Sequence, residues 1–264
     1  MKLKSDNAEV FYEVLGEGPA VVLLHAFPAD HNLWRPVAER LATRYRVVLM
    51  DLRGHGQSSA GEGPATMEKH AADLARVCDA AGVGKAVFGG VSIGGYVLFE
   101  FWRRCRERFR GLILSDTRAQ EDTEQARAAR WQAAETVERN GPDTFLETMV
   151  PRLLGKSTMI NRPDLVEALR ALTSRMTIAG IAAVQRGMAA RPDSVPTLRT
   201  ITAPTLLLFG DEDTLTPVSE GELMRRDIAQ SRLQVLARAG HLAVFEQQDA
   251  AHQAIRDFLD HLRT

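Results

Sequence analysis

The sequence predicts an α/β protein in which a mostly parallel β-sheet is flanked by helices and carries a helical insertion. Short β-rich runs alternate with helical patterns from the N-terminus onward, which is typical of parallel strands joined by helical crossovers. Several of these runs are continuously apolar, as in residues 20–24 (AVVLL), as expected for strands covered on both faces. One long stretch, residues 118–199, shows helical patterns and no convincing strand. It must therefore be an insertion into the alternating pattern.

The strands are predicted from their apolar and β-branched residues, each bounded by turn-forming residues. They lie at Val10–Val14, Ala20–Leu24, Arg46–Asp51, Lys85–Gly90, Gly111–Ser115, Thr205–Phe209 and Leu233–Ala237. A further segment, Lys2–Lys4, is expected to pair antiparallel with the first of these strands across Asp6-Asn7, at an edge of the sheet.

The insertion falls between two consecutive predicted strands, so it lies at the carboxyl edge of the sheet, where ligands bind in open α/β sheets. Its helices are predicted at Glu121–Arg139, Pro142–Leu154, Pro163–Ser174 and Ile178–Ala190. We divide the chain into a core domain, residues 1–117 and 200–264, and a helical cap, residues 118–199. Most apolar side chains of the cap are expected to pack helix on helix, with a minority facing a cleft. Trp131 is a candidate substrate-binding residue among them.

Composition and charge exclude several classes of partner. Of 264 residues, 45% are hydrophobic, as in a globular domain, and 33 basic residues balance 34 acidic ones, so neither nucleic acid nor an anionic membrane is favoured. The N-terminal residues lack an apolar signal core, and no apolar run approaches the roughly 18 residues of a membrane span. Cys78 and Cys105 have no metal-ligand spacing and fit a reducing compartment. We expect a soluble, cytoplasmic protein.

A G-x-S-x-G motif at residues 90–94 places a candidate nucleophile, Ser92, between a strand and a helix. The apolar run 86–88 precedes the motif, and the helical pattern 96–102 follows it. A serine on such a sharp turn projects its hydroxyl from the top of the sheet, and the neighbouring backbone then leaves little room for side chains at Gly90, Gly94 and Gly95. The strand before and the helix after make the motif specific, because the bare five-residue pattern arises by chance in many chains.

A serine hydroxyl needs a base within hydrogen-bond reach, and the base needs an acid to hold it. His241 follows the last predicted strand, which puts it at the same edge of the sheet as Ser92. Three carboxylates follow the preceding strand, and Asp213 is the candidate acid. Asp211 and Glu212 are expected to form the turn or to be solvated.

A rival acid, Asp116, ends the strand Gly111–Ser115, where some enzymes of this architecture carry their acid. The order Ser92, Asp213, His241 along the chain is the order used by hydrolases with a nucleophile elbow. We therefore prefer Asp213.

A tetrahedral intermediate also needs two N–H groups directed at its oxyanion. One is expected from Ile93, directly after the nucleophile. The other is expected from the loop 25–28 (HAFP), where Pro28 has no N–H and favours an extended Phe27, so Phe27 is the candidate donor. His25 in this loop is expected to be buried and hydrogen-bonded, with a structural role.

Motifs along nearly the whole chain resemble those of α/β-hydrolases, in the branch of small serine carboxylesterases and 3-oxoadipate enol-lactonases. They are HAFP at 25–28, DLRGHGQS at 51–58, the elbow at 90–94, GDEDTLTP at 210–217 and GHL at 240–242. The resemblance implies the α/β-hydrolase fold, a Ser92, Asp213 and His241 triad, Phe27 and Ile93 as oxyanion donors, and residues 118–199 as a cap.

The chain departs from the family pattern at two places. Ala26 stands where many relatives have glycine, which is compatible with the fold only if its φ is below zero. The run 245–248 (FEQQ) lacks a proline common after the histidine, which affects entry into the helix and not the chemistry. The motif at 51–58 is expected to organise a loop and is given no catalytic role.

These residues predict a serine carboxylesterase, without cofactor or metal, that hydrolyses short- to medium-chain esters of small molecules through an acyl-enzyme. The alternative is 3-oxoadipate enol-lactonase or a related lactone hydrolase, whose dicarboxylate substrate calls for a cation in the cap. Whether Arg118, Arg130, Arg152 or Arg175 points inward is left open, as is the oligomeric state. A second alternative is a non-catalytic ligand receptor on the same fold.

Overall fold

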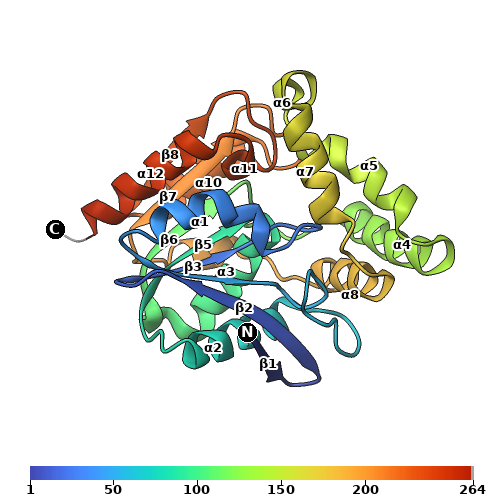
Figure 1. Ribbon diagram of the computed structural model, residues 1–264, viewed down its shortest axis with the longest axis horizontal. Coiled ribbons are helices and arrows are strands. Elements are labelled where there is room, and N and C mark those ends of the chain that lie inside the picture. Colours follow the sequence, from blue (N-terminus) through green and yellow to red (C-terminus); the bar gives the residue numbers. More distant parts are fainter. Residues whose placement is uncertain (263–264) are drawn as a thin grey trace.

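The computed structural model describes residues 1–262 and contains an eight-stranded sheet in the order β1-β2-β4-β3-β5-β6-β7-β8 (Figure 1). The strands are β1 (Lys2–Ser5), β2 (Ala8–Leu15), β3 (Ala20–Leu24), β4 (Arg46–Met50), β5 (Ala86–Val91), β6 (Phe109–Ser115), β7 (Thr205–Gly210) and β8 (Ser231–Leu236). β1 pairs antiparallel with β2, and β2 pairs antiparallel with β4. The pairs from β4 to β8 are parallel, which confirms the predicted class.

The predicted N-terminal hairpin is present, with Lys2 opposite Phe11 and Lys4 opposite Glu9. The largest shifts in strand boundaries are at the starts of β2, β6 and β8, each of which begins two residues before its predicted start. The edge strand β8 begins at Ser231, before the predicted Leu233. Arg232 and Gln234 are exposed on this edge, so the apolar pattern marks only part of the strand.

Both faces of the sheet are covered, and this explains the continuous apolar runs. In β3, Val21 and Leu23 belong to one hydrophobic core, whereas Val22 and Leu24 belong to the other. The first core packs against α1 (Arg35–Leu41) and α12 (Gln248–His261), and the second against α2 (Met67–Ala80), α3 (Ile93–Cys105) and α10 (Val218–Asp227). Because successive side chains of a strand point to opposite faces, a strand covered on both sides must be apolar throughout.

Between β6 and β7 the chain forms a helical insertion, residues 118–199, whose helices α4–α8 gather to one side of the sheet (Figure 1). Its helices are α4 (Glu124–Asn140), α5 (Asp143–Leu153), α6 (Lys156–Asn161), α7 (Pro163–Thr173), α8 (Ile178–Ala189) and α9 (Val195–Leu198). The longer ones coincide with the predicted helices. The short α6 and α9 were not predicted, because one or two turns offer too few positions to display a helical period.

Across residues 1–262, no helix is both long and apolar enough to cross a membrane. Cys78 and Cys105 are free thiols. Burial raises the pKa of the Cys78 thiol to about 12, so this cysteine is not a nucleophile at neutral pH.

Candidate active site

Ser92 lies on the turn between β5 and α3, with φ 53° and ψ −114°, a conformation that is strained for a residue with a side chain. Close backbone approaches hold this turn. A Cβ atom on Gly90 would lie 2.4 Å from the carbonyl carbon of Gly94, and one on Gly95 would lie 2.4 Å from the Thr117 hydroxyl. Neither glycine has a positive φ, so crowding alone excludes a side chain there.

Ser92, His241 and Asp213 form a continuous hydrogen-bonded chain. Nδ1 of His241 lies 2.9 Å from Oδ2 of Asp213, and Nε2 lies 2.8 Å from Oγ of Ser92. A carboxylate can only accept, so Nδ1 carries the proton and Nε2 is free to accept the serine proton. The three residues follow β5, β7 and β8, whose carboxyl ends meet at one edge of the sheet.

Asp213 is held by its own loop. Its Oδ1 accepts the N–H groups of Leu215 (2.7 Å) and Thr216 (3.0 Å), and the Thr216 hydroxyl contacts both Oδ2 of Asp213 and Nδ1 of His241. Burial on its own would raise the pKa of Asp213, but the hydrogen bond and charge of His241, with the bonds from Thr216, outweigh it and lower that pKa. Sequence analysis did not single out Thr216, although a hydroxyl three residues after a candidate acid could have indicated it.

The rival acid, Asp116, lies elsewhere in the network. It is fully buried and accepts the N–H groups of Gly210 (2.9 Å) and Ala243 (3.0 Å) and the hydroxyl of Ser115 (2.8 Å). None of its hydrogen bonds within the described residues reaches His241. Burial, and next the negative charge of Asp213, raises the pKa of Asp116 well above its usual value. The structure thus brings Asp213, and not Asp116, to the histidine.

The two backbone groups expected to bind an oxyanion belong to Phe27, in the loop after β3, and Ile93, at the start of α3. Within residues 1–262, no acceptor takes either N–H. Ala26 is not among the residues with positive φ, so alanine is compatible with this loop.

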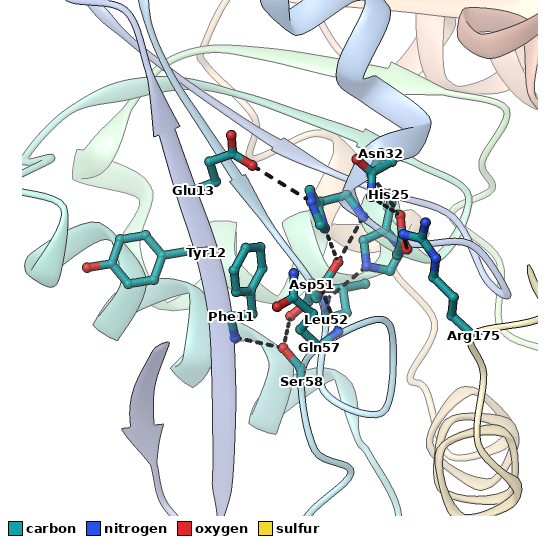
Figure 2. Close-up of polar contacts among 12 residues, drawn as sticks. Phe11, Tyr12, Glu13, His25, Asn32, Asp51, Leu52, Gln57, Ser58 and Arg175 are labelled. Atoms are coloured by element: carbon teal, nitrogen blue, oxygen red, sulfur yellow. Dashed lines mark hydrogen bonds and ion pairs between the residues drawn. The ribbon is translucent and has the colours of Figure 1, made fainter. Parts of the chain in front are cut away.

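The loop that carries Phe27 is tied to the motif at 51–58 by the buried network in Figure 2. Nε2 of His25 accepts the N–H of Leu52 at 2.9 Å, which gives His25 the expected structural role. Asp51 accepts the N–H and the ring Nδ1–H of His31 on Oδ1 and the N–H of Gln57 on Oδ2. Burial would raise the pKa of Asp51, but the bond from His31 and the neighbouring histidines lower it. The motif therefore supports the loop that carries Phe27.

Asp30, His31 and Asp51 bring ligand-type atoms within 4.8 Å of one another, which is a spacing that could suit a metal ion. Their oxygens, however, already have donors. Asp30 accepts from Asn32 on Oδ1 and from the Arg175 guanidinium on Oδ2, at 2.9 Å, and both oxygens of Asp51 accept N–H groups. A cation would face these N–H groups and a guanidinium, so the cluster does not fit a metal.

A cavity of about 410 Å³ opens beside Ser92 and His241. The helical insertion supplies most of its walls. Its apolar walls include Phe27, Phe145, Met149, Leu153, Met188 and Leu215, and its polar walls include Tyr96, Arg118, Asp122, Arg130, Arg152, Gln185 and Thr216.

Trp131 does not line this cavity, and we withdraw it as a substrate-binding candidate. Its side chain is 43% exposed, and the guanidinium of Arg186 lies 5.5 Å from the ring centroid. The neighbouring Arg130 and Ala133 do line the cavity. Each residue of a helix is turned by about 100° from the one before, so the composition of α4 could not show which face is turned inward.

Three of the four arginines left open by the sequence line the cavity: Arg118, Arg130 and Arg152. Arg175 instead pairs with Asp30. Arg130 is paired with Asp122, and Arg118 donates to the carbonyl oxygen of Leu215. Arg152 has no hydrogen bond or ion pair with any residue from 1 to 262, so its charge is free to meet a ligand.

The architecture and this site define an α/β-hydrolase. The family model of the alpha/beta hydrolase fold matches residues 19–248, and the chain belongs to that family.

Two kinds of relative resemble the chain along nearly its whole length. A thermophilic esterase from Thermogutta terrifontis, solved with malate bound, is 42% identical with a TM-score of 0.96, covering 100% of this chain and 99% of that one. The 3-oxoadipate enol-lactonase 1 of Acinetobacter baylyi is 30% identical over 91% of this chain and 88% of its own length. The enol-lactonase from Burkholderia xenovorans LB400 is 26% identical, with a TM-score of 0.91, covering 98% of this chain and 100% of that one.

Proposed function

We propose that the protein is a serine hydrolase that cleaves carboxylic esters of small molecules through an acyl-enzyme on Ser92. The observation that carries the proposal is the hydrogen-bonded chain of Ser92, His241 and Asp213 at a cavity that Phe27 also lines. The N–H groups of Phe27 and Ile93, which no acceptor takes within residues 1–262, support it. Its esterase and enol-lactonase relatives support the same bond type, since a lactone is a cyclic ester.

The geometry suits the following course. Nε2 of His241 takes the proton of Ser92 as Oγ attacks the ester carbonyl, and the N–H groups of Phe27 and Ile93 bind the oxyanion. His241 then gives the proton to the leaving alkoxide, and the C–O bond of the ester breaks. A water molecule, deprotonated by His241, attacks the acyl-enzyme. The bond between the carbonyl carbon and Oγ of Ser92 then breaks, Oγ takes the proton from His241, and the acid is released. Asp213 keeps the imidazole oriented and stabilises its charged form.

We assign residues 118–199 as a cap that bounds the cavity, and we expect a preference for short or medium acyl chains. Catalytic efficiency on 4-nitrophenyl esters should rise with chain length and then fall, because each methylene contributes about 0.8 kcal/mol only while the cavity has room for it. We place the maximum at or below roughly eight carbons for a cavity of about 410 Å³.

Two variants check that the cavity sets this maximum. Met149→Ala enlarges a wall and should move the maximum to a longer chain, whereas Trp131→Ala, on the outer surface, should leave it in place. A monotonic rise to long-chain esters would contradict a bounded cavity.

The free Arg152 specifically favours the second candidate function, hydrolysis of a carboxylate-bearing lactone or ester. Arg152→Gln should lower kcat/KM for such substrates by about fivefold, because an ion pair at a partly exposed site contributes up to about 1 kcal/mol. Neutral esters of the same length should change by less than about twofold.

The matched control is Arg139→Gln, which removes an exposed arginine of the insertion that does not line the cavity. It should leave both substrate classes unchanged. Equal losses for neutral and charged substrates in Arg152→Gln would show that Arg152 does not recognise a carboxylate. Turnover of neutral esters measured beside an enol-lactone then ranks the two candidate functions.

A further inference from the structure

The cap touches the loop of the candidate catalytic histidine through two glycines. Gly155 precedes α6, and Gly240 directly precedes His241. A Cβ atom on Gly240 would lie 2.3 Å from the backbone nitrogen of Gly155, and one on Gly155 would lie 2.7 Å from that of Gly240. Neither glycine has a positive φ, so it is the contact between the two backbones that leaves no room for a side chain.

A single buried carboxylate joins these two backbones. Glu246, in α11 (Ala243–Glu246), accepts the N–H of Gly155 on Oε2 at 2.7 Å and the N–H of Gly240 on Oε1 at 2.8 Å. Its side chain is almost inaccessible to solvent. Burial raises the pKa of Glu246, against the opposing effect of hydrogen bonds from Thr158 and from the two glycines. Burial of a carboxylate is costly unless hydrogen-bond donors replace the water that it loses, and the N–H groups of the two glycines provide these hydrogen bonds.

The loop of His241 is anchored on both sides by buried carboxyl groups. Glu246 holds the N–H of Gly240 just before the histidine, and Asp116 holds the N–H of Ala243 just after it. Only Glu246 also reaches the cap, through Gly155.

We propose that Glu246 is a positioning residue for His241. By binding Gly240 and Gly155 at the same time, it holds the histidine loop in a fixed position relative to residues 155–158 of the cap. The proposal rests on the proposed function of His241 as the base. It assigns to Glu246 no contact with substrate.

The chemistry of the partners provides a sharp test. Each carboxylate oxygen of Glu246 accepts a backbone N–H group, and such groups can only donate, so the amide nitrogen of Glu246→Gln must face one of them without a bond. Glu212 makes another carboxylate link to the cap, accepting the N–H and the hydroxyl of Ser157. In Glu212→Gln the hydroxyl can turn and accept from the amide, so both contacts survive. Glu212→Gln is therefore the matched control.

We expect Glu246→Gln to lower kcat by about tenfold or more with less than about a threefold change in KM, because small displacements of a catalytic group are costly. Glu212→Gln should stay within about twofold of the wild type. Active sites are counted by reaction with diethyl 4-nitrophenyl phosphate, so that loss of folded protein is not mistaken for loss of rate. Amide hydrogen exchange should accelerate in Glu246→Gln at both Gly155 and Gly240.

A lower melting temperature with kcat within about twofold of the wild type would overturn the proposal, since Glu246 would then be merely structural. If Glu246→Gln does not fold, Gly155→Ala presses on the same backbone contact from the cap side and should lower kcat similarly. Its Cβ also meets the carboxylate of Glu212, whose separate effect the Glu212→Gln control measures. Unchanged kcat in that variant also overturns the proposal. If the wild-type protein hydrolyses no ester, the proposed function fails. Hydrogen exchange then tests by itself whether Glu246 joins Gly155 to Gly240. Faster exchange at only one of these glycines in Glu246→Gln contradicts that link.

Discussion

Ser92→Ala is expected to lower ester hydrolysis by about 10⁴- to 10⁶-fold while the fold stays intact. Removal of the nucleophile abolishes the acyl-enzyme route and leaves only the contribution of the oxyanion site and substrate binding. The fold should survive because the turn is built by close approaches at its glycines, and the Ser92 side chain contributes one hydrogen bond, to His241. The rate is measured on 4-nitrophenyl butyrate, with circular dichroism and the melting temperature as controls for folding.

Activity of this variant within about tenfold of the wild type would place the nucleophile elsewhere. A ligand that binds both forms equally tightly, with no turnover by either, would favour a receptor on a hydrolase fold. Both results are distinct from unfolding, which circular dichroism detects.

Asp213→Asn is expected to lower kcat by about 10⁴-fold with a modest change in KM. The asparagine can present an N–H to Nδ1 of His241, which selects the wrong tautomer and leaves Nε2 protonated toward Ser92. The charge that stabilises the imidazolium is also lost. Initial rates of hydrolysis measured over a range of substrate concentrations separate kcat from KM.

Asp116→Asn is the comparison for this prediction, because Asp116 is a second buried carboxyl group at the same edge of the sheet. Asp116 makes no hydrogen bond to His241 within the described residues, so its asparagine variant leaves the tautomer of His241 unchanged. The amide nitrogen must, however, face the N–H of Gly210 or of Ala243 without a bond, which disturbs the histidine loop. We expect a loss of kcat of about tenfold, far smaller than that of Asp213→Asn. The reverse ranking of the two variants would show that the acid is Asp116 and that Asp213 belongs to the turn.

Much of the site could be predicted because its residues follow parallel strands. The apolar runs before Ser92 and Asp213 are buried in strands β5 and β7, and the partly exposed edge strand β8 precedes His241. The carboxyl ends of these parallel strands lie together. Residues far apart in the chain are therefore brought together by strand direction alone. The candidate oxyanion donors follow from the same geometry, since Phe27 comes after β3 and Ile93 begins α3.

The contacts of the helical insertion could not be predicted in this way. The pattern of α4 indicated a helix, but the tertiary structure turned Arg130 toward the cavity and Trp131 outward. Glu212 was expected to form a turn or be solvated, yet it accepts two hydrogen bonds from Ser157 across the boundary of the insertion. Glu246 lies in a short helix with no motif to mark it.

The sequence by itself determined the α/β class, the parallel strands, the elbow at Ser92 and the loops that carry Asp213 and His241, because each depends on local periodicity and on strand direction. Only the tertiary structure decided that Arg152 is the unpaired cation of the cavity and that Glu246 joins Gly155 to Gly240. These features depend on how the helices of the insertion pack against the core. That packing sets which face of each helix turns inward and which charges find partners, and neither is encoded in the spacing of residues along the chain.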